Sequence, residues 1–165
     1  MIDPFLQKLY TTSVLTEVAG VSPVTLRAWR NRNGLFPDTA GQRKWNRFSI
    51  SDICIARTIV LLTAHGLSTG DAIWFAEPHL RTAFTVVEME AMSPLVGFGK
   101  GADGKAWFLP YLEDQPISTL VDREGGLITI LDLRTVISWV KEHLPSIANT
   151  KAEASDQSLT SSLLG

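Results

Sequence analysis

The chain has 165 residues, of which 45% are hydrophobic and 19% charged, with a formal net charge of −2 at pH 7. This is enough apolar material for a core that needs no disulfide or metal, and it excludes a chain that is disordered throughout. The single cysteine, Cys54, excludes an internal disulfide and the cysteine pairs of structural zinc sites. No apolar stretch is long enough to cross a membrane, and the N-terminus lacks the pattern of a secretory signal. We therefore expect a cytoplasmic globular protein.

Positive charge is concentrated in the N-terminal third of the chain. Residues 1–60 contain eight Lys and Arg residues against four acidic residues, whereas the remaining 105 residues contain seven basic and thirteen acidic residues. The first part therefore carries a net charge of +4 and the second −6. This distribution indicates a basic binding surface joined to an acidic second part.

Two short helices are predicted near the N-terminus. The first begins at Thr11 or Thr12, either of which can cap it, and ends at Gly20, a residue suited to a left-handed helix end. The second follows Ser22, which offers its hydroxyl to free backbone amides, and covers about residues 23–31. Two short helices joined by a glycine-containing turn are typical of a helix-turn-helix.

A basic stretch and two more helices follow. Residues 41–48 combine three cations with aromatic residues that can anchor a short β-ribbon, and this pattern predicts a wing. Ser49 and Asp52 have the spacing of a capping box, which opens a third helix that ends near Gly66. The same capping pattern recurs at Ser68 and opens a further helix.

Three landmarks occur in order within residues 11–68. They are Ala19-Gly20-Val21-Ser22 followed by Thr25-Leu26-Arg27, then Gly34-Leu35, then Gly41-Gln42-Arg43-Lys44-Trp45. With this order and spacing, the stretch resembles the MerR-type winged helix-turn-helix domain of bacterial transcription regulators. The resemblance implies a regulator that binds specific sequences of double-stranded DNA, with the helix at about 23–31 in the major groove and the wing on the backbone or minor groove. The chain departs from the family pattern at Ala28 and Gln42, where the family usually has aromatic residues.

The chemistry of the basic residues independently favours DNA binding. Arg27 and Arg30 are three residues apart and share a helix face, where guanidinium groups can reach phosphates and base edges. We expect Trp29 to be partly buried with an edge facing DNA, and Trp45 to anchor the wing rather than insert into DNA. The predicted DNA-binding residues are Ser22, Thr25, Arg27, Trp29, Arg30, Asn31, Arg32, Arg43, Lys44, Trp45 and Arg47.

The helices that follow the predicted wing carry a candidate dimer seam. Pro78 should break or kink the helical pattern there and become the first residue of the next helix. Apolar residues on both sides of it alternate at spacings of three and four, as in a helix-packing seam. Such a stripe can pair with a second copy or face the core of its own chain. The predicted homodimerisation stripe is Ile73, Ala76, Leu80, Ala83 and Val87.

The pattern changes after residue 94 to that of two hairpins and a helix. Turn-rich links join residues 95–98 to 105–109 and residues 117–122 to 127–131, and Asp132 caps the helix. The expected fold is therefore mainly α with small β elements. Its expected parts are a winged helix-turn-helix domain (1–68), linker or dimerisation helices (69–93), an α+β module (94–145) and a flexible tail (146–165).

Catalysis is not expected from this sequence. His65, His79 and His143 lack metal-ligand spacing, and Cys54 is expected to be a buried, inert thiol, so we predict neither a metal nor a cofactor. The C-terminal module could contact RNA polymerase or a small-molecule effector. Two alternative functions stay open: an architectural DNA-binding factor of a phage or mobile element, similar to an excisionase, and a protein-interaction adaptor that has lost DNA binding.

Overall fold

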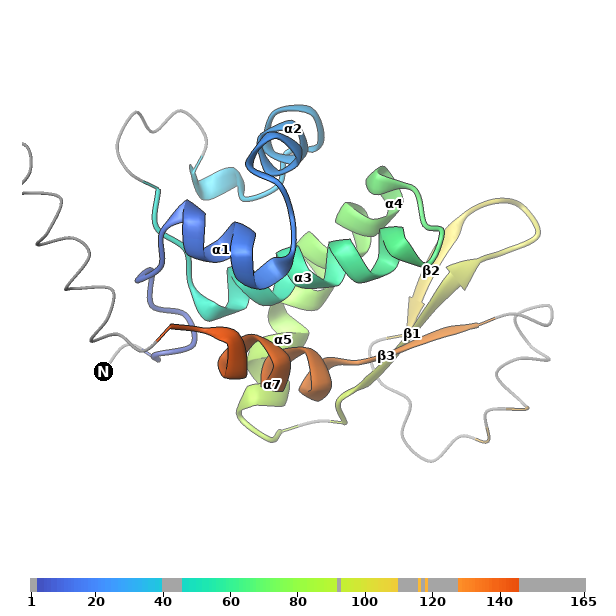
Figure 1. Ribbon diagram of the computed structural model, residues 1–165. Helices are drawn as coiled ribbons and strands as arrows, with labels where there is room; N and C mark the ends of the chain where they lie inside the picture. The colour runs from blue at the N-terminus through green and yellow to red at the C-terminus, as the bar shows by residue number, and fades with distance from the viewer. Residues whose placement is uncertain are drawn as a thin grey trace, which may run out of the picture.

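The computed structural model describes residues 3–39, 46–91, 93–109, 116, 118 and 128–145. These residues form a mainly helical fold with a small three-stranded sheet, as expected. The helix α3 (Ile50–Ala64) lies in the middle of the helical part, with α1 and α2 on one side, α5 and α7 on the other, and the sheet at one end (Figure 1).

The first two helices confirm the predicted helix-turn-helix. Helix α1 (Thr12–Ala19) is capped by the hydroxyl of Thr11, and it ends at Gly20, whose φ of 75° lies in the left-handed region. Helix α2 (Pro23–Asn33) is capped by Ser22, whose Oγ accepts a hydrogen bond of 3.0 Å from a backbone amide. The local capping residues therefore set the start of both helices.

The segment between α2 and α3 contains a short 3₁₀-helix, η1 (Pro37–Thr39). At the end of this segment Phe48 is fully buried, forms an antiparallel bridge with Tyr10, and packs its ring 5.4 Å from the ring of Phe36. Most of the predicted wing at 41–48 lies outside the described residues. Phe48 therefore fixes the point at which the chain returns from that segment to the core.

The predicted capping box at the start of α3 is confirmed. The Ser49 amide donates to the Asp52 carboxylate over 2.7 Å, and the Asp52 amide donates to the Ser49 hydroxyl over 3.1 Å. Most of the helix beyond this cap is buried, including Cys54. Burial raises the pKa of the Cys54 thiol far above its usual value, so the thiol is held in its protonated form.

The helix that contains Pro78 differs from the prediction. It runs without a break through α4 (Thr69–Trp74), the π-helix η2 (Phe75–Leu80) and α5 (Arg81–Glu88). The prediction that Pro78 begins a new helix is wrong, because the proline lies inside the π-helical segment. A proline has no amide hydrogen and clashes with the carbonyl one turn back, and the wider π turn accommodates both defects within a continuing helix.

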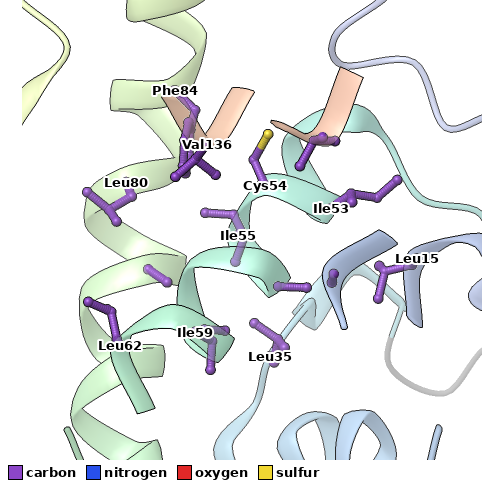
Figure 2. Close-up of a cluster of buried hydrophobic side chains, with 14 of the residues drawn as sticks. Leu15, Leu35, Ile53, Cys54, Ile55, Ile59, Leu62, Leu80, Phe84 and Val136 are labelled. Carbon is purple, nitrogen blue, oxygen red and sulfur yellow. The ribbon is translucent and has the colours of Figure 1, made fainter. Parts of the chain in front are cut away.

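The predicted dimerisation stripe lies in the core of a single copy. Leu80 and Phe84, one turn later, belong to the same buried cluster as Ile55 of α3 and Val136 of α7 (Figure 2). The chain's own helices therefore cover this face, which corrects the prediction of a seam open to a second copy. All five stripe residues are buried: Ile73, Ala76, Leu80, Ala83 and Val87.

The described part of the sheet has the strand order β2-β1-β3. The first predicted hairpin is confirmed, since β1 (Leu95–Lys100) pairs antiparallel with β2 (Ala106–Leu109). The strand β3 (Thr129–Asp132) pairs with the other edge of β1. The first arm of the second predicted hairpin, at 117–122, lies largely outside the described residues.

The last helix, α7 (Leu133–His143), begins at the predicted cap, Asp132, whose carboxylate accepts backbone amides of the first turn. Its buried face joins the same hydrophobic core as α1, α3 and α5. The boundaries expected at residues 69 and 94 therefore do not separate hydrophobic cores. The predicted tail at 146–165 lies outside the described residues, and no helix among the described residues has the length and apolar character needed to cross a bilayer.

Candidate nucleic-acid interface

Helix α2 presents one face to the core and the opposite face to solvent. Leu26 and Trp29 are buried and hold the helix against the rest of the domain. On the solvent side, Val24, Arg27 and Asn31 are all exposed, and their spacing of three and four residues places them on one face. The exposed residues at and within α2 include Ser22, Thr25, Arg27, Asn31 and Arg32 from the predicted set.

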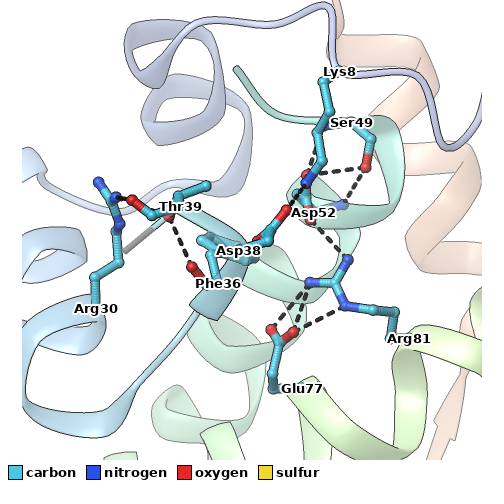
Figure 3. A network of polar contacts seen from close by, with 9 residues as sticks. All are labelled: Lys8, Arg30, Phe36, Asp38, Thr39, Ser49, Asp52, Glu77 and Arg81. Carbon is cyan, nitrogen blue, oxygen red and sulfur yellow. Dashed lines mark hydrogen bonds and ion pairs between the residues drawn. The ribbon is translucent and has the colours of Figure 1, made fainter. Parts of the chain in front are cut away.

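Two of the predicted DNA-binding residues of α2 make contacts within the domain. Trp29 is only 6% exposed and belongs to the hydrophobic core, so the prediction that one of its edges faces DNA is wrong. Arg30 is half-buried, and its Nη2 donates to the backbone oxygen and the Oγ1 of Thr39 over 3.2 and 2.8 Å (Figure 3). Both side chains therefore orient α2 within the domain.

The bond between Arg30 and Thr39 joins α2 to η1. Thr39 is buried, and its hydroxyl in turn donates to the backbone oxygen of Phe36 over 2.8 Å. The guanidinium thus connects the helix to the start of the segment that leads to residues 41–48. Local sequence patterns do not indicate this contact, because Thr39 is nine residues from Arg30 and outside the helix.

The start of α2 carries two exposed hydroxyl groups close to each other. The Oγ of Ser22 and the Oγ1 of Thr25 are 2.8 Å apart and hydrogen-bonded. Ser22 is the helix cap, as predicted, and the pair lies at the positive end of the helix dipole. Hydroxyls and amides at such a position can receive a phosphate oxygen.

The cations of the predicted wing are described only in part. Arg43, Lys44 and Trp45 lie outside the described residues. Arg47 is exposed, and its Nη1 donates to the backbone oxygen of Leu9 over 3.2 Å. This bond places one cation of the segment beside Leu9 and Tyr10, whose backbone amides donate to the Phe48 oxygen.

A buried carboxylate joins three separate segments beneath this surface. Asp52 is 0% exposed, and its oxygens accept from Lys8 Nζ over 2.7 Å and from Arg81 Nη1 over 2.8 Å (Figure 3). Lys8 also pairs with Asp38 over 2.9 Å, and Arg81 with both oxygens of Glu77. The network therefore fixes the start of α3 to the N-terminal segment, to η1 and to α5.

The protonation of this network follows from its burial and its partners. Burial by itself would raise the pKa of Asp52, but the hydrogen bonds from Lys8, Ser49 and Arg81 outweigh it, so the pKa lies below its ordinary value. Burial likewise opposes the charge on Arg81, yet the bonds to Glu77 and Asp52 raise its pKa. Asp52 and Arg81 therefore carry charge at neutral pH.

A second contact joins the helix-turn-helix to the C-terminal helix. Arg57 of α3 lies 4.6 Å from the ring centroid of Trp139 of α7, and its Nη1 is 3.4 Å from the backbone oxygen of Ala19. Trp139 stacks in turn on His143, with 3.8 Å between the ring centroids. A cation at the C-terminal end of α1 is favourable for the helix dipole, so Arg57 stabilises the turn that precedes α2.

The histidines and acidic residues form no metal centre in the described part of the chain. No three His, Cys, Asp or Glu side chains are grouped there as metal ligands would be. His79 is half-buried between Trp74 and Phe108, and His143 is engaged with Trp139.

Comparison with known proteins identifies the N-terminal part. Residues 10–73 match the model of the MerR HTH family of regulatory proteins, and the matched region covers α1, α2, α3 and most of α4. No match to the chain was found among curated proteins. The members of the matched family are DNA-binding regulators rather than enzymes. The chain therefore contains an N-terminal MerR-type helix-turn-helix domain, which supports a DNA-binding regulator in general terms.

Proposed function

We propose that this protein is a transcription regulator that recognises a specific sequence in double-stranded DNA. In this proposal α2 enters the major groove, and residues 41–48 contact the backbone or the minor groove. The observation that carries it is the outward face of α2, where Arg27 and Asn31 project from a helix that Leu26 and Trp29 hold against the core. A helix of this kind on a rigid support is the usual reader of base edges.

The exposed residues divide into two roles. Arg27 and Asn31 have the chemistry to contact a guanine and an adenine edge respectively, since these side chains form paired hydrogen bonds to those bases. Ser22 and Thr25 at the helix start, and Arg32 at its end, are suited to phosphates. Arg43, Lys44 and Arg47 are proposed to bind phosphates from the wing, and Trp45 to anchor it.

The proposal includes a homodimer, because two-fold proteins read inverted repeats with one helix per half-site. The buried stripe from Ile73 to Val87 is not available for this contact. A two-fold contact must therefore use another surface of the chain.

Selection of bound sequences from a random duplex pool tests the proposed function. We expect a defined consensus, an inverted repeat within it, and affinity that falls steeply with salt because phosphate contacts release counterions. Arg27→Ala and Asn31→Ala should reduce preference for the consensus, at about 1–3 kcal/mol for each lost base contact. Arg134→Ala, on the exposed side of α7, is the matched control and should bind as the wild type does.

Other outcomes would identify the alternatives. Cooperative binding that bends DNA with little sequence preference would indicate an architectural factor. Absence of binding at low ionic strength, together with a stable complex with another protein, would indicate an adaptor and would contradict the proposal.

A further inference from the structure

Val24 is the most exposed large apolar side chain in the described part of the chain, at 75%. It lies in the first turn of α2, directly after the Ser22 cap and Pro23. The next most exposed is Met89, at 68%, which follows α5. Val24 is the only exposed large apolar side chain among the described residues that lies on α2. The other exposed large apolar side chains in the described part of the chain are Leu6, Leu9, Trp74, Met89 and Trp139.

The fold does not account for a valine at this position. Its side chain is mostly in solvent and so adds little to the core. A β-branched residue also lowers helix propensity compared with alanine or the long polar residues. Single exposed apolar residues are common on protein surfaces, so exposure alone decides nothing.

Val24 lies on the same exposed face of α2 as the proposed base-contacting residues. Arg27 is three residues later and Asn31 seven residues later on the same face, and all three are exposed. Val24 and Arg27 are separated by about 4.5 Å along the helix axis, which is close to the rise of one base pair, about 3.4 Å. A helix that brings Arg27 to one base pair therefore brings Val24 to the same or the adjacent pair.

Only one group in the major groove is matched by an apolar side chain. Guanine, adenine and cytosine present hydrogen-bonding groups there, whereas thymine also presents its C5-methyl group. We propose that Val24 is a specificity-determining residue that reads the methyl group of a thymine next to the base pair contacted by Arg27. This inference rests on the proposed function and specifies the base class that the outward face of α2 recognises.

Replacement of thymine by deoxyuracil tests the inference, because it removes the methyl group and leaves base pairing intact. Each thymine of the selected duplex is replaced in turn, and the affinity is measured by fluorescence anisotropy. For the wild type we expect a loss of about fourfold at one thymine per half-site, the factor for one buried apolar carbon, and little change elsewhere. The Val24→Ala variant should bind the thymine duplex and the duplex with deoxyuracil at that position with equal affinity.

Two controls test whether the loss of thymine discrimination is specific to Val24 and is not caused by a change in the fold. Met89→Ala removes another exposed apolar side chain, away from α2, and should keep the fourfold discrimination. The helix content of Val24→Ala, measured by circular dichroism, should match that of the wild type.

The outcomes distinguish the two proposals. If deoxyuracil has no effect at any position, or if Val24→Ala keeps the discrimination, the role of Val24 is refuted while sequence-specific binding stands. If the wild type binds no duplex, the proposed function and this inference both fail.

Discussion

Replacement of the buried carboxylate by Asp52→Asn should destabilise the protein strongly. Asp52 is fully buried and accepts hydrogen bonds from Lys8, Arg81 and both donors of Ser49. Asparagine keeps the shape but loses the charge, and one of its two acceptor oxygens becomes an NH₂ donor that faces other donors. The start of α3 would then lose the ion pairs that attach it to the N-terminal segment and to α5.

The size of the expected loss in stability depends on the partners that Lys8 and Arg81 keep in the variant. Breaking a buried ion pair by removal of one partner costs about 3–5 kcal/mol. Lys8 and Arg81 are each partly exposed and each keeps a second carboxylate, Asp38 and Glu77 respectively. We therefore expect a smaller loss, about 2–3 kcal/mol in the free energy of unfolding, or about 5–10 °C in Tm.

The pH dependence gives an independent check. The pKa of Asp52 is lower in the folded than in the unfolded protein, so its contribution to stability is present above the unfolded pKa, about 3.9. That contribution is lost as the pH falls through the folded pKa. The difference in stability between wild type and Asp52→Asn should therefore be constant near neutrality and shrink below about pH 4.

Denaturant unfolding followed by circular dichroism measures both effects. The exposed Glu142→Gln on α7 is the matched control and should change stability by less than about 0.5 kcal/mol. If Asp52→Asn unfolds at the wild-type midpoint, or if its deficit does not depend on pH below 4, the network does not stabilise the fold in the way described.

Three further predictions concern single residues. Arg30→Ala should weaken DNA binding without changing its salt slope, because the guanidinium is bound to Thr39, whereas loss of a phosphate contact would lower the slope by about one. Gly20→Ala should lower stability by about 1–2 kcal/mol in thermal unfolding, because its φ is 75°, whereas Gly70→Ala, where an added Cβ meets open space, should not. Cys54 should resist a thiol reagent at pH 8 until the protein is unfolded, and rapid labelling of the folded protein would contradict its burial.

Features set by neighbouring residues could be predicted from the sequence. The caps at Thr11, Ser22, Ser49 and Asp132 were predicted because each depends on a side chain two or three residues from the amide it accepts. The first hairpin was predictable for the same reason, since its turn residues lie between its strands.

Features set by distant partners could not be predicted. The stripe that includes Leu80 has the same spacing whether it meets a second copy or its own α3 and α7, so its burial required the tertiary fold. Trp29 and Arg30 carry the same chemistry at a DNA surface as in a structural contact, and only the positions of the core and of Thr39 distinguish the two. Pro78 was expected to interrupt a helix, but a π turn accommodates it.

Methylation interference on the selected duplex tests most directly whether α2 reads the major groove. The N7 atom of guanine lies in the major groove and the N3 atom of adenine in the minor groove, so methylation of each reports on one groove. We predict that N7 methylation of a guanine in each half-site blocks binding of the wild type, and that Arg27→Ala, which binds more weakly, no longer distinguishes that methylated guanine. Binding that tolerates N7 methylation at every guanine of the site would contradict the placement of α2 in the major groove.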